Sequence, residues 1–272
     1  MEDRGTATRP GFFSRFGSGF GFFVQGFREA YAGGRLRFSL TPLVINIVLF
    51  IGLVWLIWGT DVLEMFTATP EAWYWRALYW LLDWLIKLVL FYLVLILFPV
   101  IGSIVASPFL DLLTEKQEEE MLGRPVAPPF TVVGMLGDIL RATAHALKGL
   151  GLGTLCAGVL LLINILPGIG QVLYIVLNAC LAALFFSLQF MDYPLARRRL
   201  SYGAKLKAVL HDTGGSLGLG LAIFLCAMIP VLNAAMLAPA ACGATLLYHR
   251  IAGDGAVPLT PPDDVVSKPN TP

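Results

Sequence analysis

Long apolar runs without charge alternate with charged segments along this chain. The first run extends from Phe38 to Gly59, and the second extends from Leu85 to Ser107 with Lys87 as its one charge. As helices that rise about 1.5 Å per residue, both runs are long enough to cross about 30 Å of hydrocarbon. The pattern therefore predicts two long transmembrane helices.

A third uncharged run, residues 149–191, has a turn signal in its middle. As one straight helix it would be about 65 Å long, roughly twice the bilayer core. Pro167 and Gly168 must therefore break it into two antiparallel arms. The tip carries no charge, which favours a re-entrant hairpin that turns inside the membrane and is sheltered by protein. A fully spanning hairpin remains open, because each arm is long enough.

A fourth uncharged run, residues 213–248, repeats this design around Pro230. The segments ILPGIGQ and MIPVLNA match in their order of apolar residues, proline and a small or polar residue. Broken helices of this kind surround the central site of some transporters. Pro167, Gly168, Pro230 and Asn233 are therefore candidate pathway or packing residues. Chance similarity between apolar segments is the alternative.

The segment before the first run carries an aromatic stripe at helical spacing, formed by Phe16, Phe20, Phe23, Phe27 and Tyr31. The stripe predicts an N-terminal amphipathic helix that lies in the membrane interface. Five glycines in this segment each cost about 1 kcal/mol of helix propensity, so a disordered arm is the alternative. At the other end, the Pro-rich tail 253–272 is expected to be disordered, which leaves residues 1–252 as a single membrane domain.

A charged helix is expected directly after the second run. An apolar face is predicted from the spacing of Phe109, Leu112, Leu113 and Leu122. The glutamates fall mostly on the other face, and two of them, Glu115 and Glu118, are candidate pathway or packing residues.

An acid and a base stand four positions apart at the start of the second run, Asp83 and Lys87. A charge pair inside a membrane can mark an ion path. However, four tryptophans surround this pair and indicate an interfacial belt, so we expect Lys87 to snorkel toward the membrane surface.

Composition strengthens the membrane assignment. Hydrophobic residues make up 57% of the 272 residues and charged residues 14%, against roughly 25% charged in soluble domains. The mean hydropathy is +0.75. We therefore expect an all-α integral membrane protein with the lipid bilayer as its partner. The four cysteines lie in apolar stretches without a C-x-x-C pair, and no catalytic or nucleotide-binding motif occurs. We expect no enzyme, metal site, cofactor or nucleic-acid partner.

Charge asymmetry predicts the orientation. Six arginines and three acids precede the first run, and the loop after it is acidic. The other basic clusters follow the second run and each hairpin. By the positive-inside rule, both termini are cytoplasmic.

The segment AGGRLRFSLTP combines features that suit an oxyanion. Gly33 and Gly34 allow the backbone to approach a ligand, and Arg35 and Arg37 can donate charge-assisted hydrogen bonds. Phe38 and Ser39 then lead into a helix whose N-terminus favours an anion. The candidate anion-binding residues are Gly33, Gly34, Arg35, Arg37, Phe38 and Ser39. Alternatively, the two arginines serve only as topology anchors.

Several segments together resemble the CysZ sulfate permease family, which has the EI24 domain. They are PLVIN (42–46), ASPFLDLLTEKQEE (106–119), LPGIGQ (166–171), MDYP (191–194) and IPVLN…LAPAACGAT (229–245). The resemblance implies two long spanning helices, two partly inserted helical hairpins and assembly into homo-oligomers. It also implies uptake of sulfate across the bacterial inner membrane for cysteine synthesis. A non-transporting membrane scaffold with the same architecture is the alternative.

The sulfate-binding stretch of that family has the form Gly, any residue, Arg, Arg, Phe before the first spanning helix. Here it reads Gly34-Arg35-Leu36-Arg37-Phe38. Arg37 matches the second arginine, whereas Leu36 replaces the first and Arg35 is displaced by one position. One residue is a rotation of about 100° on a helix, so the resemblance assigns the anion to Arg37 more than to Arg35.

Overall fold

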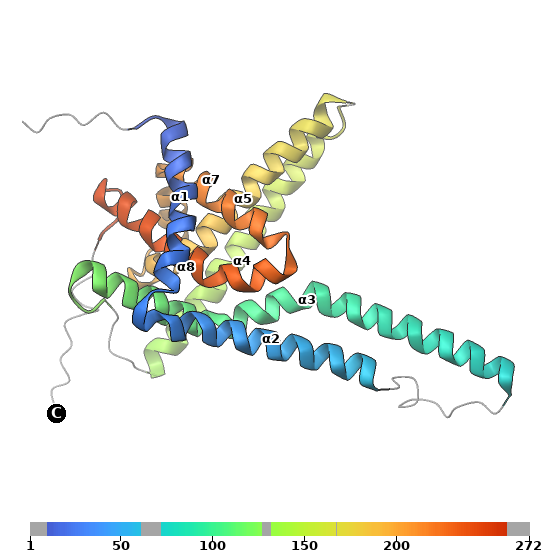
Figure 1. Ribbon diagram of the computed structural model, residues 1–272. Helices are drawn as coiled ribbons and strands as arrows, with labels where there is room; N and C mark the ends of the chain where they lie inside the picture. The colour runs from blue at the N-terminus through green and yellow to red at the C-terminus, as the bar shows by residue number, and fades with distance from the viewer. Residues whose placement is uncertain (1–9, 61–71, 127–131, 167, 260–272) are drawn as a thin grey trace, which may run out of the picture. The chain divides into compact units, whose positions relative to one another are not determined.

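The computed structural model describes residues 10–60, 72–126, 132–166 and 168–259. Within these ranges every regular element is a helix, which confirms the all-α prediction (Figure 1). The elements are α1 (Phe12–Ala30), the short 3₁₀ helix η1 (Gly33–Arg35), α2 (Leu36–Gly59), α3 (Trp73–Leu122), α4 (Val132–Ile163), α5 (Ile169–Arg197), α6 (Tyr202–His211), α7 (Thr213–Ala227) and α8 (Pro230–Gly253).

Four helical segments among the described residues are long and apolar enough to cross a membrane. They are Leu36–Gly59, Trp73–Leu122, Thr143–Ile163 and Ile169–Arg197. A fifth span is formed if α6 and α7, which meet at a bend of 97°, count as one broken helix. The expected multi-pass membrane protein is therefore confirmed at the level of helix length and composition.

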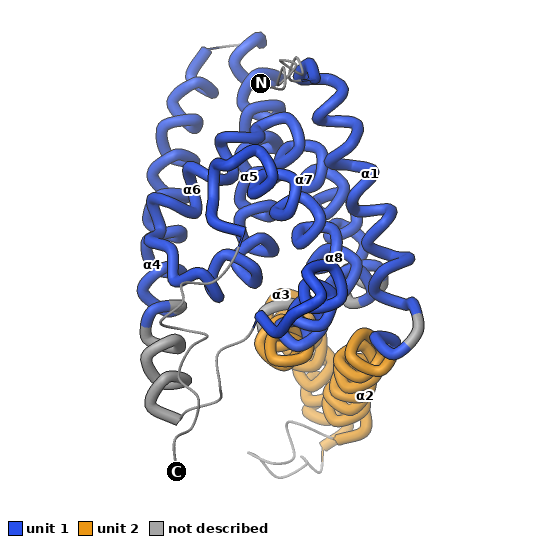
Figure 2. The backbone as a smooth tube through the Cα atoms, turned by 90° about the vertical axis from the view of Figure 1, so that its left-hand side faces the viewer, with its two compact units in different colours: residues 1–36, 110–272 blue, residues 37–109 orange. Residues whose placement is uncertain are grey.

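The chain divides into two compact units (Figure 2). Unit 2 contains residues 37–109, drawn in orange, and unit 1 contains residues 1–36 and 110–272, drawn in blue. The expectation that residues 1–252 form a single domain stays a prediction. Of the tail 253–272, for which disorder is predicted, residues 253–259 are described and residues 260–272 lie outside the described residues.

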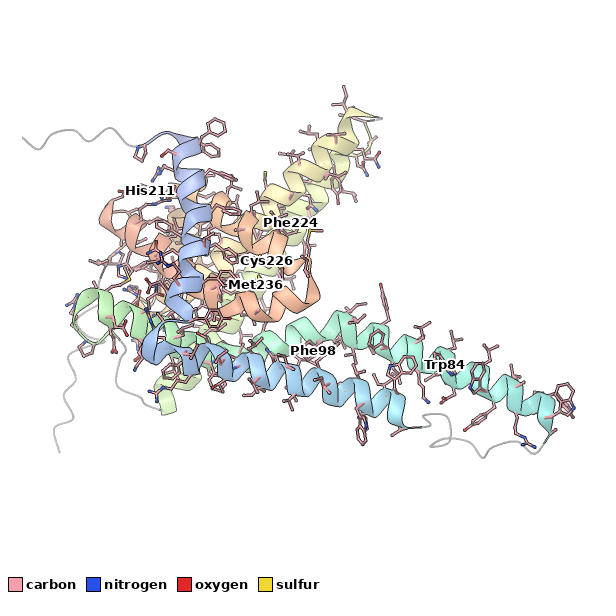
Figure 3. The ribbon with its side chains drawn as sticks, in the orientation of Figure 1. Trp84, Phe98, His211, Phe224, Cys226 and Met236 are labelled. Carbon is pink, nitrogen blue, oxygen red and sulfur yellow. The ribbon has the colours of Figure 1, made fainter. Side chains whose placement is uncertain are left out.

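Unit 2 is an antiparallel pair of long helices whose register is set by polar and aromatic contacts. The Nδ2 atom of Asn46 donates to the carbonyl oxygen of Gly102 at 3.3 Å. Farther along the pair, the ring of Phe50 meets Phe98 and the ring of Trp58 meets Trp84, each with ring centroids 5.0 Å apart (Figure 3). Many outward side chains of α2 and α3 are apolar and exposed, as expected for helices that face lipid.

The predicted pair of Asp83 and Lys87 is in contact. Lys87 is only 7% exposed, and its Nζ lies 2.7 Å from Oδ2 of Asp83, one helical turn earlier on α3. The snorkelling of Lys87 toward the membrane surface stays a prediction.

Unit 1 is built around α1, which packs against both α7 and α8. Glycines make the close approach possible. A Cβ atom on Gly19 would overlap the carbonyl oxygen of Gly215, and one on Gly26 would overlap that of Pro239. The alternative of a disordered N-terminal arm is therefore wrong: glycines that weaken an isolated helix are required where helices touch. Its position in the membrane interface stays a prediction.

A buried carboxylate organises the sharp bend between α6 and α7. Asp212 accepts from the backbone N–H of Gly215 at 2.9 Å and so caps α7. Its Oδ1 atom also lies 3.0 Å from Nε of Arg15 on α1, and its Oδ2 atom pairs with Arg250 on α8. One side chain thus joins three helices.

The first Pro-centred hairpin is formed by α4 and α5. Pro167 lies outside the described residues, and Gly168 adopts a φ of 81° at the turn, which an L side chain rarely adopts. Ile165, Leu166 and Ile169 are all exposed, Ile169 at 82%. The described part of this chain does not shelter the tip, and both the re-entrant and the fully spanning arrangement of this hairpin stay predictions.

The second Pro-centred break lies between α7 and α8, and Pro230 begins α8. The two hairpins are not equivalent, however. α7 has 15 residues, about 22 Å of helix, which is too short to cross a bilayer alone. α7 and α8 are largely buried against α1 and α5, whereas the outer parts of α4 and α5 are exposed.

The glycine contacts predict opposite effects of alanine at neighbouring positions on α1. Gly19→Ala should destabilise the protein by about 1–3 kcal/mol, because the new Cβ meets backbone that must move. Gly21→Ala, the matched control, has open space around it and should stabilise by up to about 1 kcal/mol through helix propensity. Thermal unfolding in detergent measures both. Equal midpoints would contradict the packing of α1.

The exposed tip of the α4–α5 hairpin leads to a labelling prediction. A cysteine at Ile169, in a background without the four native cysteines, should react slowly with an impermeant maleimide from either side of the membrane. The reason is that a re-entrant tip ends within lipid or a protein contact. Rapid labelling from the side opposite the termini would instead establish a fully spanning hairpin.

Candidate functional site

The glycine-arginine segment predicted to bind an anion extends across the boundary between the two units, and each side is described by itself. In unit 1, Arg35 is buried and committed to carboxylates. Its Nη2 atom lies 2.7 Å from Oε2 of Glu29, and its Nη1 atom lies 3.8 Å from Oε2 of Glu120. Gly33 belongs to η1, and a Cβ on Gly34 would meet no atom within 4 Å. Packing therefore does not require glycine at position 34.

In unit 2, Arg37 lies in the first turn of α2 and is exposed. Its guanidinium stacks over the ring of Phe38, 4.8 Å from the ring centre. Its backbone carbonyl accepts from Oγ1 of Thr41 at 2.6 Å, and Ser39 is buried. Of the two arginines, Arg37 thus presents its guanidinium outward, while Arg35 is held by acids.

A buried charge cluster that the sequence did not predict lies elsewhere in unit 1. Glu118 of α3 is fully buried, and its Oε2 atom lies 2.9 Å from Nη1 of Arg197 and 2.9 Å from Nη1 of Arg198. Nε2 of His249 lies 3.7 Å from Oε1. α5 ends at these arginines, so the carboxylate joins α3 to α5, and His249 of α8 lies beside it.

The position of Glu118 corrects the predicted faces of this part of α3. The buried face consists of Leu110, Leu113, Thr114, Gln117 and Glu118, which follow helical spacing. Leu113 is buried as predicted, but Leu112 is 46% exposed and Glu115 is half-buried. Hydrophobic spacing predicted a face centred on Leu112, whereas the buried face includes polar residues. Those polar residues can be buried because they bind partners on α5 and α8. Gln117, for example, donates to the carbonyl oxygen of Cys242 at 3.3 Å.

Arg197 fastens the end of α5 to α3. Its Nη2 atom donates to the carbonyl oxygen of Asp111 at 2.6 Å, to the Asp111 carboxylate at 2.8 Å and to Oγ1 of Thr114 at 2.6 Å. Asp111 itself is exposed. Thus the second acid of the cluster lies at the surface rather than in the core.

Arg198 is the most enclosed cation of the cluster. It is 2% exposed, and its guanidinium lies over the ring of Tyr248 at 4.5 Å. Nη1 donates to Glu118 and to the carbonyl oxygen of Pro194, and Nη2 donates to the carbonyl oxygen of Leu259 at 2.8 Å. Its Nε has no hydrogen-bond partner among the described residues. The orientation prediction counted the basic cluster after the first hairpin as surface charge. Of its three consecutive arginines, Arg197 and Arg198 are buried and Arg199 is exposed.

The guanidinium charges of the cluster are balanced by two carboxylates. Arg197 and Arg198 share the buried carboxylate of Glu118, and Arg197 also pairs with the exposed carboxylate of Asp111 at 2.8 Å. Burial lowers the pKa of His249 below its ordinary value, so this imidazole is neutral near pH 7. Burial raises the pKa of Tyr248, so its hydroxyl remains a hydrogen-bond donor.

The other candidate residues lie away from this cluster. Gly168 precedes the first turn of α5, whereas Arg197 is its last residue. Pro230 and Asn233 lie at the start of α8, and Tyr248 lies near its end. Arg197 and Tyr248 thus lie at the ends of α5 and α8 opposite to the Pro-centred turns, and a pathway shared by these turns with Glu115 and Glu118 of α3 stays a prediction.

Removing the shared carboxylate should destabilise the bundle. Glu118→Gln leaves two buried guanidinium groups without a buried counter-charge, at a cost of about 3–5 kcal/mol. Glu119→Gln is the control on the next residue and should change stability by less than about 0.5 kcal/mol. Midpoints of thermal unfolding in detergent measure both. A Glu118→Gln protein as stable as wild type would contradict the energetic role of the cluster.

Comparison with known proteins relates these features to a family. The profile of the family described as EI24, sulfate transporter CysZ/etoposide-induced protein 2.4, matches residues 22–237. The match includes residues 33–39, Glu118 and both buried arginines, and it ends before Tyr248. A curated relative from Pectobacterium atrosepticum, sulfate transporter CysZ, is 29% identical over 236 residues, which is 85% of this chain and 84% of the relative. Because the profile matches most of its length, this chain belongs to the EI24 family.

Proposed function

We propose that this protein is a sulfate permease or channel of the bacterial inner membrane, which supplies sulfate for cysteine biosynthesis. The observation that carries the proposal is the similarity, over 85% of the chain, to a relative named sulfate transporter CysZ. The helices long enough to span a membrane support a multi-pass arrangement. Excess arginine before α2 supports cytoplasmic termini.

Arg37 is the residue that we propose captures sulfate. Its guanidinium is exposed, so sulfate can reach it without displacing a protein carboxylate. Stacking on Phe38 restricts the orientation of the guanidinium plane, which favours two parallel hydrogen bonds to a tetrahedral oxyanion. Its place in the first turn of α2 adds the favourable end of the helix dipole. Gly33, Gly34, Phe38 and Ser39 shape the approach, and Arg35 has a smaller role because Glu29 and Glu120 already hold it.

We further propose that Glu118 serves packing and Arg positioning rather than direct contact with sulfate. A carboxylate repels a dianion, but this one is neutralised by two guanidinium groups. The exposed apolar arms of the α4–α5 hairpin support assembly with lipid and further copies of the chain into a homo-oligomer.

A non-transporting membrane scaffold is the second candidate. The observation that favours it is the description of the matched family, which also includes etoposide-induced protein 2.4, a name without a transport activity. Both candidates use the same helices, so only the movement of an anion distinguishes them.

Reconstituted transport tests the proposal directly. Purified protein in liposomes should carry radiolabelled sulfate, selenate and molybdate should compete, and chloride at equal ionic strength should compete weakly. Sulfate movement no faster than in empty liposomes, with correctly assembled protein, would support the scaffold instead.

Substitutions at the arginines test the capture site. Arg37→Ala should weaken sulfate binding about ten- to a hundredfold, because a charge-assisted hydrogen bond contributes roughly 1.5–3 kcal/mol. Arg37→Lys should recover only part of the loss, since an ammonium lacks the two-pronged geometry. Arg35→Ala should weaken sulfate affinity less. Arg28→Ala, an exposed arginine on α1, is the control. Equal sulfate affinity of wild type and Arg37→Ala in calorimetry would leave the arginines as topology anchors.

A further inference from the structure

The chain continues past α8 and folds back over the buried charge cluster. Gly255 turns the chain with a φ of 77°, and the side chain of Val257 is buried. The carbonyl oxygen of Pro258 accepts from the hydroxyl of Tyr248, and the carbonyl oxygen of Leu259 accepts from Nη2 of Arg198. We call residues 256–259 the C-terminal strap.

The two donors that hold the strap are also suited to an oxyanion. An arginine N–H and a phenolic O–H converge on two successive carbonyl oxygens, which are neutral acceptors. A hydrogen bond to a charged acceptor is stronger than one to a neutral carbonyl oxygen. A dianion offers several charged acceptor oxygens, so its bonds to the same donors are stronger.

The strap is attached lightly enough to be displaced. It follows α8, the last helix among the described residues, so it can leave without breaking a described helix of the bundle. Val257 is its one buried side chain. The match to the EI24 family ends at residue 237, so the strap lies beyond the part of the chain that the family profile covers.

We propose that Arg198 and Tyr248 form a second oxyanion site, and that the C-terminal strap occupies it as a tethered competitor. Sulfate and the strap exclude each other, because they use the same N–H and O–H groups. The strap therefore keeps the site closed when sulfate is scarce. This inference rests on the proposed function for the identity of the anion, but the competition itself concerns any tetrahedral oxyanion.

Two truncations of the full chain separate the strap from the residues after it. A chain that ends after Gly255 lacks the strap and should bind sulfate about tenfold more tightly, because an occupied site reduces apparent affinity by its closed fraction. A chain that ends after Leu259 keeps the strap and should bind as wild type. Equal affinities of the two truncated chains would overturn the proposal.

Point variants test the same idea without shortening the chain. Val257→Asp should release the strap, since it would bury a carboxylate, and it should reproduce the gain in affinity. Tyr248→Phe in the chain that ends after Gly255 keeps the ring beneath Arg198 but removes the hydroxyl, so it should lose several-fold of the gain. A full gain in that variant would exclude Tyr248 from the site.

A transport-independent measurement separates this proposal from the proposed function. A spin label on Leu259→Cys, in a background without native cysteines, should be immobile without oxyanion and mobile in sulfate. Chloride at equal ionic strength should leave it immobile. If sulfate neither binds nor crosses the membrane, the proposed function fails, and selenate or phosphate then decides whether oxyanions release the strap. If none of these oxyanions makes the spin label mobile, the proposed competition between oxyanion and strap is wrong, whether or not sulfate is transported.

Discussion

A carboxylate shared by two guanidinium groups is the constraint on which the arrangement of unit 1 depends. Removing three charges from water costs several kcal/mol per ion, and only close, well-directed pairs offset that cost. Glu118 makes such pairs with Arg197 and Arg198 at 2.9 Å. Sliding α3 by one residue along α5 would leave both arginines buried and unpaired. The cluster therefore selects one register among many that would bury apolar side chains equally well.

Such selection matters more in a bilayer than in water. Lipid is as apolar as leucine, so exposed leucines and isoleucines on α2, α3, α4 and α5 gain little by choosing a protein neighbour. Specific association then depends on hydrogen bonds and on close backbone contact. Both occur here: Asn46 bonds to Gly102 in unit 2, and Gly19 and Gly26 bring α1 against α7 and α8 in unit 1.

The sequence was informative where a property is local and failed where it depends on a distant partner. Apolar runs predicted the long helices, and Gly168 marked the first turn, because length and backbone freedom are local. The glycines of α1 were counted as a weakness, since their contacts lie about 200 residues away in α7 and α8. Glu118 was assigned to a polar face because its arginine partners are 79 and 80 positions away. At the candidate site, the resemblance to the family's anion-binding stretch favoured Arg37 over Arg35, but no local pattern indicated that Glu29 holds Arg35.

In the proposed transport, the exposed Arg37 and the buried Arg198 suit different steps. Arg37 is exposed to solvent, so an anion that binds there loses little of its hydration and is bound with modest affinity. Arg198 is buried, so its electrostatic attraction for an anion is strong. An anion bound by a buried cation without a counter-charge would dissociate too slowly. Conduction requires binding that is weak enough to release. Glu118 and the carbonyl oxygen of Leu259 already accept hydrogen bonds from Arg198, and this reduces the affinity of Arg198 for an anion. In the proposed second oxyanion site, the same contacts that stabilise the fold therefore set an upper limit on how tightly Arg198 binds an anion.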